Sequence, residues 1–284
     1  MIRRPPRSTQ GVSSAASDVY KRQEMVPGAH HETGSAMTTD FTGLVRVAMW
    51  SGPRNISTAM MRAWENRPDS VVVDEPLYAH YLDVTGKDHP MAAEVISAGE
   101  TDWEKAVEWL TRSEPDGVEV FYQKHMAHHL LPGMGREWID SLENCFLLRH
   151  PAEMLTSLIK ILPEPGLADT GLPQQLELFS KVREQTGRRP PVLDSRDVLE
   201  NPERLLRLLC EEIGIDFSSA MLSWEPGKRD TDGIWAPHWY GEVEKTTSFR
   251  PYAPKEEEVP GEFGTVLKEC MEIYEELYQY RLGN

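Results

Sequence analysis

Short apolar runs alternate along this chain with longer stretches of helical periodicity. The runs are bounded by turn residues and predict five short strands, at 45–50, 71–73, 118–122, 145–148 and 192–193. The helical patterns cover 57–64, 103–110, a stretch that begins at Pro151, 173–185, 205–213 and 264–282. Strands that alternate with helices predict an α/β fold of three layers, with a central, mainly parallel sheet flanked by helices.

Polar punctuation marks the helix starts and one long loop. Asn55 is a candidate N-cap for the helix from Ser57, and Asn201 precedes a proline at the start of the helix through 205–213. Residues 225–262 are rich in proline, glycine, tryptophan and charge. A loop of that length within a compact domain is usually functional or disordered.

The first 41 residues show neither the apolar runs of strands nor the periodicity of helices. Residues 1–23 carry five basic residues and one acid, a composition typical of a disordered tail. An arginine-rich, acid-poor segment also fits a mitochondrial presequence, but the string resembles translated sequencing-adapter read-through more closely. We expect a tail over 1–41, with Met37 as a candidate start, and one folded domain over 42–284.

Charge and cysteine content narrow the function classes. The formal net charge of −16 argues against a nucleic-acid binder and against a protein held to anionic lipid. No run approaches the roughly 18 apolar residues of a membrane span. The cysteines are few and far apart, at Cys145, Cys210 and Cys270. We therefore expect a cytoplasmic protein without a disulfide framework.

A candidate anion-binding loop follows the first strand. Gly52-Pro53 predicts a tight turn, and Ser57-Thr58 place two hydroxyls at the start of the next helix. Such a helix start directs free N–H groups at an anion, and Arg54 adds positive charge. A hydroxyl-capped helix without a ligand would have the same pattern. The loop is not a Walker A motif, because Ile56 and Ser57 replace its second glycine and its lysine.

A second candidate phosphate site follows the fourth strand. That strand ends at Arg149, and Ser157 lies eight residues later, about two turns into the next helix. A guanidinium and a hydroxyl in this arrangement can hold one phosphate. Taken singly, Arg149 fits a surface salt bridge better than a phosphate site, and Ser157 fits an exposed helix serine better.

In this order the motifs resemble those of the sulfotransferase family that uses 3'-phosphoadenosine-5'-phosphosulfate (PAPS). The family's proline-lysine-serine-glycine-threonine-threonine loop corresponds to 53–58, with Arg54 at the lysine. Its arginine, acid or amide, proline and later serine correspond to Arg149-His150-Pro151 and Ser157. Its lysine-threonine-histidine-leucine-proline stretch corresponds to 123–127, which puts His125 at the catalytic histidine. The resemblance covers roughly residues 45–282.

The resemblance implies a P-loop-type α/β fold and metal-independent, in-line transfer of a sulfuryl group from PAPS to a hydroxyl or amine. The small-molecule acceptor would be apolar or aromatic if the aromatic residues line its pocket, and no nucleic-acid or membrane partner is expected. The 3'-phosphate would be held by Arg149 and Ser157, with Lys228 and Arg229 standing in for the family's late glycine-rich loop. The 5'-phosphosulfate would be bound by Gly52, Pro53, Arg54, Asn55, Ile56, Ser57 and Thr58.

The chain departs from the family around the adenine. Ala59 stands where many members have a tryptophan, and Ser195 stands at a family tyrosine. Trp235 or Trp239 would then have to contact the adenine. This departure keeps a non-catalytic nucleotide-binding domain open as an alternative.

Two residues are candidates for the base that takes the acceptor's proton. Arg54 is a further catalytic candidate, but not for the base. His125 has the family position and a suitable ordinary pKa. Glu75 follows the second strand, and burial would raise the pKa of its carboxyl. We prefer His125. A nucleotide-dependent kinase on the same fold is a further alternative, although the missing Walker lysine counts against it.

Overall fold

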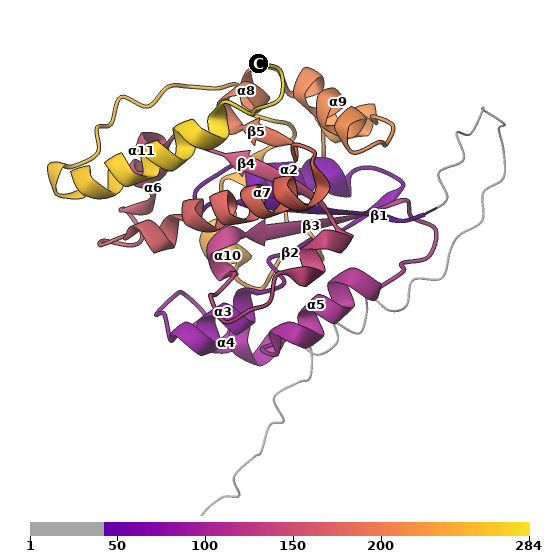
Figure 1. Cartoon of the computed structure of the whole chain (residues 1–284), viewed down its shortest axis with the longest axis horizontal. Coiled ribbons are helices and arrows are strands. Elements are labelled where there is room, and N and C mark those ends of the chain that lie inside the picture. The colour runs from indigo at the N-terminus through magenta and orange to yellow at the C-terminus, as the bar shows by residue number, and fades with distance from the viewer. Residues whose placement is uncertain (1–42) are drawn as a thin grey trace, which may run out of the picture.

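The computed structural model describes residues 43–284, so the predictions for residues 1–41 fall outside the described part. Its centre is a sheet of five strands in the order β2-β3-β1-β4-β5 (Figure 1). All neighbouring strands pair in parallel, which confirms the predicted α/β fold. The strands are β1 (Val45–Ser51), β2 (Ser70–Asp74), β3 (Val120–Met126), β4 (Glu143–Leu148) and β5 (Val192–Asp194).

Helices cover both faces of the sheet (Figure 1). Each of the six predicted helices is present, and α3, α4, α8 and the short α10 were not predicted. The helices are α2 (Ser57–Glu65), α3 (Tyr78–Thr85), α4 (Ala92–Ala98), α5 (Trp103–Arg112), α6 (Pro151–Leu158), α7 (Leu172–Thr186), α8 (Ser195–Glu200), α9 (Pro202–Glu212), α10 (Ala236–Trp239) and α11 (Gly264–Tyr278).

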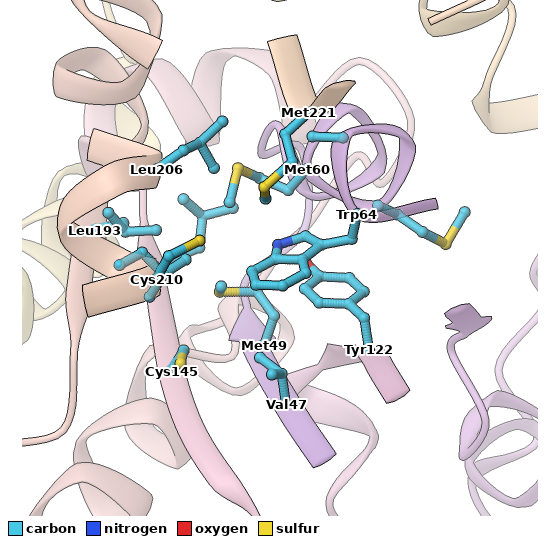
Figure 2. Packing of buried hydrophobic residues seen from close by; sticks show 14 of the residues in the cluster. Val47, Met49, Met60, Trp64, Tyr122, Cys145, Leu193, Leu206, Cys210 and Met221 are labelled. Atoms are coloured by element: carbon cyan, nitrogen blue, oxygen red, sulfur yellow. The ribbon is translucent and has the colours of Figure 1, made fainter. Parts of the chain in front are cut away.

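The alternation of side chains along β1 divides the core in two. Val47 and Met49 point to the face covered by α2 and α9, while Ala48 and Trp50 point to the face covered by α6, α7 and α11. On the first face the rings of Trp64 and Tyr122 stack with their centroids 5.1 Å apart (Figure 2). Burial on both faces explains why the strand segments read as apolar runs.

Asn55 does not cap α2, so that prediction is wrong. Ile56 occupies the N-cap position, and no side chain caps the helix. The Asn55 amide instead donates to the carbonyl of Leu147 at 2.8 Å, and its oxygen accepts from the N–H of Ile56 at 2.8 Å. It therefore fixes the turn after β1 to the neighbouring strand β4. Asn201 does cap α9, as predicted, by accepting from the N–H of Arg204.

The predicted loop over 225–262 runs past the carboxyl ends of the strands and is held by buried polar contacts. Asp232 forms an ion pair at 2.7 Å with Arg62, whose side chain is 1% exposed in α2. The carboxylate of Asp74 accepts from the N–H of Gly233 at 3.1 Å and from the hydroxyl of Tyr240 at 2.6 Å. Among residues 43–284, none of the helices combines the length and the apolarity needed to cross a membrane.

Candidate active site

A cavity of about 410 Å³ lies at the carboxyl ends of the parallel strands. The segment that follows β1, residues 53–59, lines one side. Glu75 enters after β2, Lys124 and Met126 from the end of β3, and Arg149 after β4. The crevice beyond the strand ends is where open α/β sheets bind their ligands.

Three of the predicted phosphate-binding residues meet beside this cavity. Arg54 donates from Nε to the Ser157 hydroxyl at 2.9 Å, and Arg149 donates to the backbone carbonyl of Arg54. Arg54 has a φ of 56°, in the left-handed region that non-glycine residues rarely adopt. Such strain is retained where the surrounding structure imposes it, often at ligand sites. Residues 53, 55, 56 and 58 and the buried Ser57 also line the cavity.

Gly52 lies behind this loop and does not line the cavity. A Cβ at this position would lie 2.4 Å from the backbone carbonyl oxygen of Thr170. Only glycine allows the turn to approach the segment before α7 so closely. Gly52 therefore sets the shape of the loop from behind.

Positive charge at the loop is not fully compensated. Burial and the neighbouring Arg149 lower the pKa of the Arg54 guanidinium. Arg149 pairs with Glu153 at 3.4 Å, whereas Arg54 has no ion-pair partner among the described residues. Only one of the two guanidiniums thus has a carboxylate partner, and an anion in the cavity would complete the balance.

Next to the loop, a buried cluster combines Asp74, Glu75, Lys124 and Tyr240. The Lys124 ammonium donates to Asp74 at 2.7 Å, to Glu75 at 2.5 Å and to the Tyr240 hydroxyl at 2.8 Å. Burial is the largest single influence on the pKa of Lys124 and lowers it. The two carboxylates together outweigh burial and hold this pKa well above the ordinary value. Burial raises the pKa of Glu75, and Asp74 adds to this effect, while Lys124 opposes it. Glu75 lines the cavity with a φ of 44°.

His125 is not part of this cluster and does not line the cavity. Its ring stacks on Trp50 with centroids 4.3 Å apart and contacts Trp138, and its Nε2 lies 3.1 Å from the Gln123 side-chain oxygen. Burial and the charge of Lys124 lower its pKa to about 3. The geometry therefore favours Glu75 over His125 as the base.

The long loop supplies both predicted aromatic side chains to the cavity, but its cation is not one of those predicted. Lys228 and Arg229 do not line the cavity, and Arg229 lies 3.6 Å from Glu65 on α2. Arg250 does line it and pairs with Glu242 at 3.0 Å. Sequence reasoning missed Arg250, since nothing in a loop without periodicity distinguishes one cation from another.

Trp235 and Trp239 also line the cavity, at the end beside α3. The Trp235 ring meets Tyr78 edge to face at 5.1 Å, and the Trp239 ring lies 6.4 Å from His89. Aromatic side chains surround the two tryptophans. Arg54, on the anion loop (residues 52–58), and Arg149 beside it are not among these neighbours. This placement does not favour the predicted contact with adenine.

Comparisons with known proteins give one family model and two curated relatives. A family model described as a sulfotransferase domain matches residues 45–278. Two curated relatives from Arabidopsis thaliana, branched-chain-amino-acid aminotransferase-like proteins 2 and 1, are 34% identical over 225 residues and 36% identical over 200 residues. These matches cover 79% and 70% of this chain. The chain spans only 40% and 36% of the relatives' own lengths.

A solved structure with some likeness is the sulfotransferase domain from the Synechococcus PCC 7002 olefin synthase. It has a TM-score of 0.49 and 14% identity, and the match covers 88% of this chain and 100% of that chain. A TM-score below 0.5 does not by itself establish a common fold. The fold of this chain therefore rests on its own strand order.

Proposed function

The chain belongs to the sulfotransferase domain family, and we propose that it transfers a sulfuryl group from PAPS to a hydroxyl or amine of a small-molecule acceptor. One observation carries the proposal. Arg54, Arg149 and Ser157 come from three separate segments and meet beside the anion loop, which lines the cavity at the sheet's carboxyl edge. A bound anion is the simplest physical reason for two adjacent guanidiniums at a helix start.

The cavity residues divide between the two phosphate-bearing ends of PAPS. The backbone N–H groups of residues 55, 57 and 58, with Arg54, Ser57 and Thr58, would bind the 5'-phosphosulfate. Arg149 and Ser157 would bind the 3'-phosphate, and Arg250 would take the role first expected of Lys228 and Arg229. Each of these contacts matches a charge or donor that lines the cavity or, for Ser157, touches a lining residue.

PAPS, as second substrate, supplies the sulfuryl group. The acceptor oxygen forms a bond to sulfur as the bond from sulfur to the 5'-phosphate oxygen breaks, so negative charge grows on the leaving phosphate. Arg54 and the loop N–H groups would stabilise that charge. Glu75 would accept the acceptor's proton, because it lines the cavity and its pKa is raised toward neutrality.

The test is a thermal-shift titration with adenosine-3',5'-bisphosphate, without metal, against ATP with Mg²⁺. A ligand specific for the folded state at 100 times its dissociation constant adds roughly 2.7 kcal/mol of stability. We expect stabilisation by the bisphosphate that Arg149→Ala removes. The matched control is Arg112→Ala, which changes an arginine whose side chain is 79% exposed on α5.

The other outcomes separate the alternatives. Stabilisation only by ATP with Mg²⁺ would replace the proposal with a nucleotide-dependent kinase. Binding of the bisphosphate without turnover of PAPS by any acceptor would indicate a non-catalytic domain. A response of Arg112→Ala equal to that of Arg149→Ala would remove the site assignment.

A further inference from the structure

One end of the cavity, beside α3, is walled by aromatic rings. The His129 ring lies between Tyr78 and Tyr81, with its centroid 4.7 Å from each. The His89 ring lies 5.9 Å from Tyr78 and 6.0 Å from Tyr81. With Trp235 and Trp239 these side chains form what we call the aromatic wall, and all of them line the cavity.

Two histidines in this part of the cavity have unused polar atoms. His128 and His129 are at least nine-tenths buried, and the Nδ1 of each has no hydrogen-bond partner. Burial, with smaller contributions from neighbouring histidines and lysines, lowers the pKa of His128 to about 3, against the opposing charge of Asp169, and lowers that of His129 well below its ordinary value. Both rings are thus neutral. They add hydrogen-bonding capacity to the aromatic wall without adding positive charge.

The charges beside the aromatic wall are mainly negative. Asp88, Asp169 and Glu75 line the cavity there. Lys87 is engaged by Asp169, and Lys124 is shared by Glu75 and Asp74. Asp88 has no ion-pair partner within residues 43–284. The four carboxylates named here therefore outnumber the two lysines, whereas Arg54 and Arg149 lie at the anion loop.

We propose that the acceptor is a small alcohol that carries a cationic nitrogen, bound with this nitrogen against the aromatic wall and near Asp88. This inference rests on the proposed function. Aromatic faces attract cations, and alkylammonium groups in particular are recognised by groups of aromatic rings. The carboxylates add to that attraction and repel an anionic acceptor. The neutral imidazoles can accept or donate a hydrogen bond without opposing the positive charge.

A matched pair of probes isolates the charge. Choline and 3,3-dimethyl-1-butanol have the same shape, and differ in that a quaternary carbon replaces the charged nitrogen. Calorimetry measures the binding of each probe to the full chain, which is saturated with adenosine-3',5'-bisphosphate. We expect choline to bind at least about fivefold tighter than its neutral isostere, from cation–π attraction and the unpaired carboxylate.

Two variants test the residues. Asp88→Asn should remove most of the preference for choline, whereas Asp83→Asn, an exposed acid on α3 that does not line the cavity, should preserve it. Trp239→Leu should weaken choline binding about two- to fivefold and leave the isostere unaffected.

Equal or tighter binding of the isostere would overturn the inference, and so would failure of both probes to bind a chain that does bind the bisphosphate. In both cases the proposed function would stand. A chain that does not bind the bisphosphate at all would instead overturn the proposed function and this inference with it.

Discussion

At the scale of single residues, the neighbours Lys124 and His125 show how a shift of one residue along a strand changes which side chain reaches the cavity. Side chains on a strand alternate between faces, so only one of the two can reach the cavity. In the family stretch the lysine and the histidine are two residues apart and share a face. With Lys124 in the lysine's place, Met126 and not His125 falls at the histidine, and Met126 does line the cavity. In the proposed reaction the base would then have to come from another strand end.

Glu75→Gln tests this residue as the base. The amide keeps the shape but cannot take a proton, so we expect turnover to fall about 100- to 10,000-fold. The dissociation constant for adenosine-3',5'-bisphosphate should stay unchanged, because Glu75 is not among the proposed phosphate ligands. Both quantities are measured by steady-state kinetics and calorimetry. A variant that keeps full turnover would exclude Glu75 as the base.

The pH profile gives an independent readout of the same residue. A base works only as its deprotonated form, and burial raises the pKa of Glu75. The acidic limb of kcat/KM should therefore lie above the pH expected for an ordinary glutamate, and it should disappear in Glu75→Gln. His125→Phe, which preserves the stack on Trp50, serves as the control and should retain the limb.

Lys124→Met tests the buried cluster. The ammonium is 1% exposed and is bound to two carboxylates, so its loss leaves both uncompensated. We expect the free energy of unfolding near neutral pH to fall by roughly 3–5 kcal/mol, measured by chemical denaturation. Lys268→Met, an exposed lysine on α11 whose side chain is 78% exposed, should change it little.

The pH dependence of that variant has a definite sign. Without the ammonium, burial and Asp74 should hold the folded-state pKa of Glu75 above its unfolded value, so protonation of Glu75 favours the folded state. The deficit in unfolding free energy should therefore shrink as the pH falls through the raised folded-state pKa of Glu75, reach its minimum below the unfolded-state pKa, and grow again as the pH rises. A deficit that does not vary with pH would mean that the cluster acts by packing alone.

At the scale of elements, apolar periodicity was enough to predict the sheet and the longer helices. The strand predicted at 118–122 is instead β3, Val120–Met126. Polar residues end the apolar run at Gln123, yet they are buried because each has a partner. The Gln123 amide donates to the carbonyl of Leu110, and His125 lies against the Gln123 oxygen. Such pairing depends on distant segments and has no local sequence signal.

The same reasoning explains which part of the site was predictable. Arg54 and Arg149 follow strands, and the ends of parallel strands meet at one edge of the sheet, so their proximity follows from the fold. Glu75 was predicted for the same reason. The positions of Arg250 and of Tyr240, the partner of Lys124 on the long loop, depend on how that loop folds back. Lysine within a buried strand was itself a signal, because such a charge requires a partner.

Gly52→Ala tests how the anion loop is shaped. The added methyl group would lie 2.4 Å from the carbonyl oxygen of Thr170, so the backbone of one segment must move. We expect a loss of about 1–3 kcal/mol in unfolding free energy and weaker binding of adenosine-3',5'-bisphosphate. Gly133→Ala, where a Cβ meets nothing within 4 Å, is the control. Unchanged bisphosphate affinity in a destabilised Gly52→Ala would show that the loop tolerates the shift.

At the scale of the whole molecule, α2 connects the anion loop to the long loop. Its first residues, Ser57 and Thr58, line the cavity, and Arg62 near its end pairs with Asp232. Glu65 on the same helix accepts from the Thr231 hydroxyl at 2.5 Å. The segment that carries Trp235, Trp239 and Arg250 is thereby held by the helix whose start would bind the phosphosulfate.

Asp232→Asn tests this connection. The amide is the same size, but Arg62 loses its charged partner in a position that is 1% exposed, and the more distant Glu65 at 3.3 Å remains. Removing one member of a buried pair costs roughly 3–5 kcal/mol. We expect that loss in chemical denaturation, together with faster proteolytic cleavage within 225–262 of the folded chain. Asp230→Asn, an exposed acid two residues earlier, is the matched control and should match the parent chain in both assays.

Because the two loops share α2, adenosine-3',5'-bisphosphate should slow cleavage in the parent chain and protect Asp232→Asn much less. Equal protection of both chains would show that the anion loop and the long loop act independently.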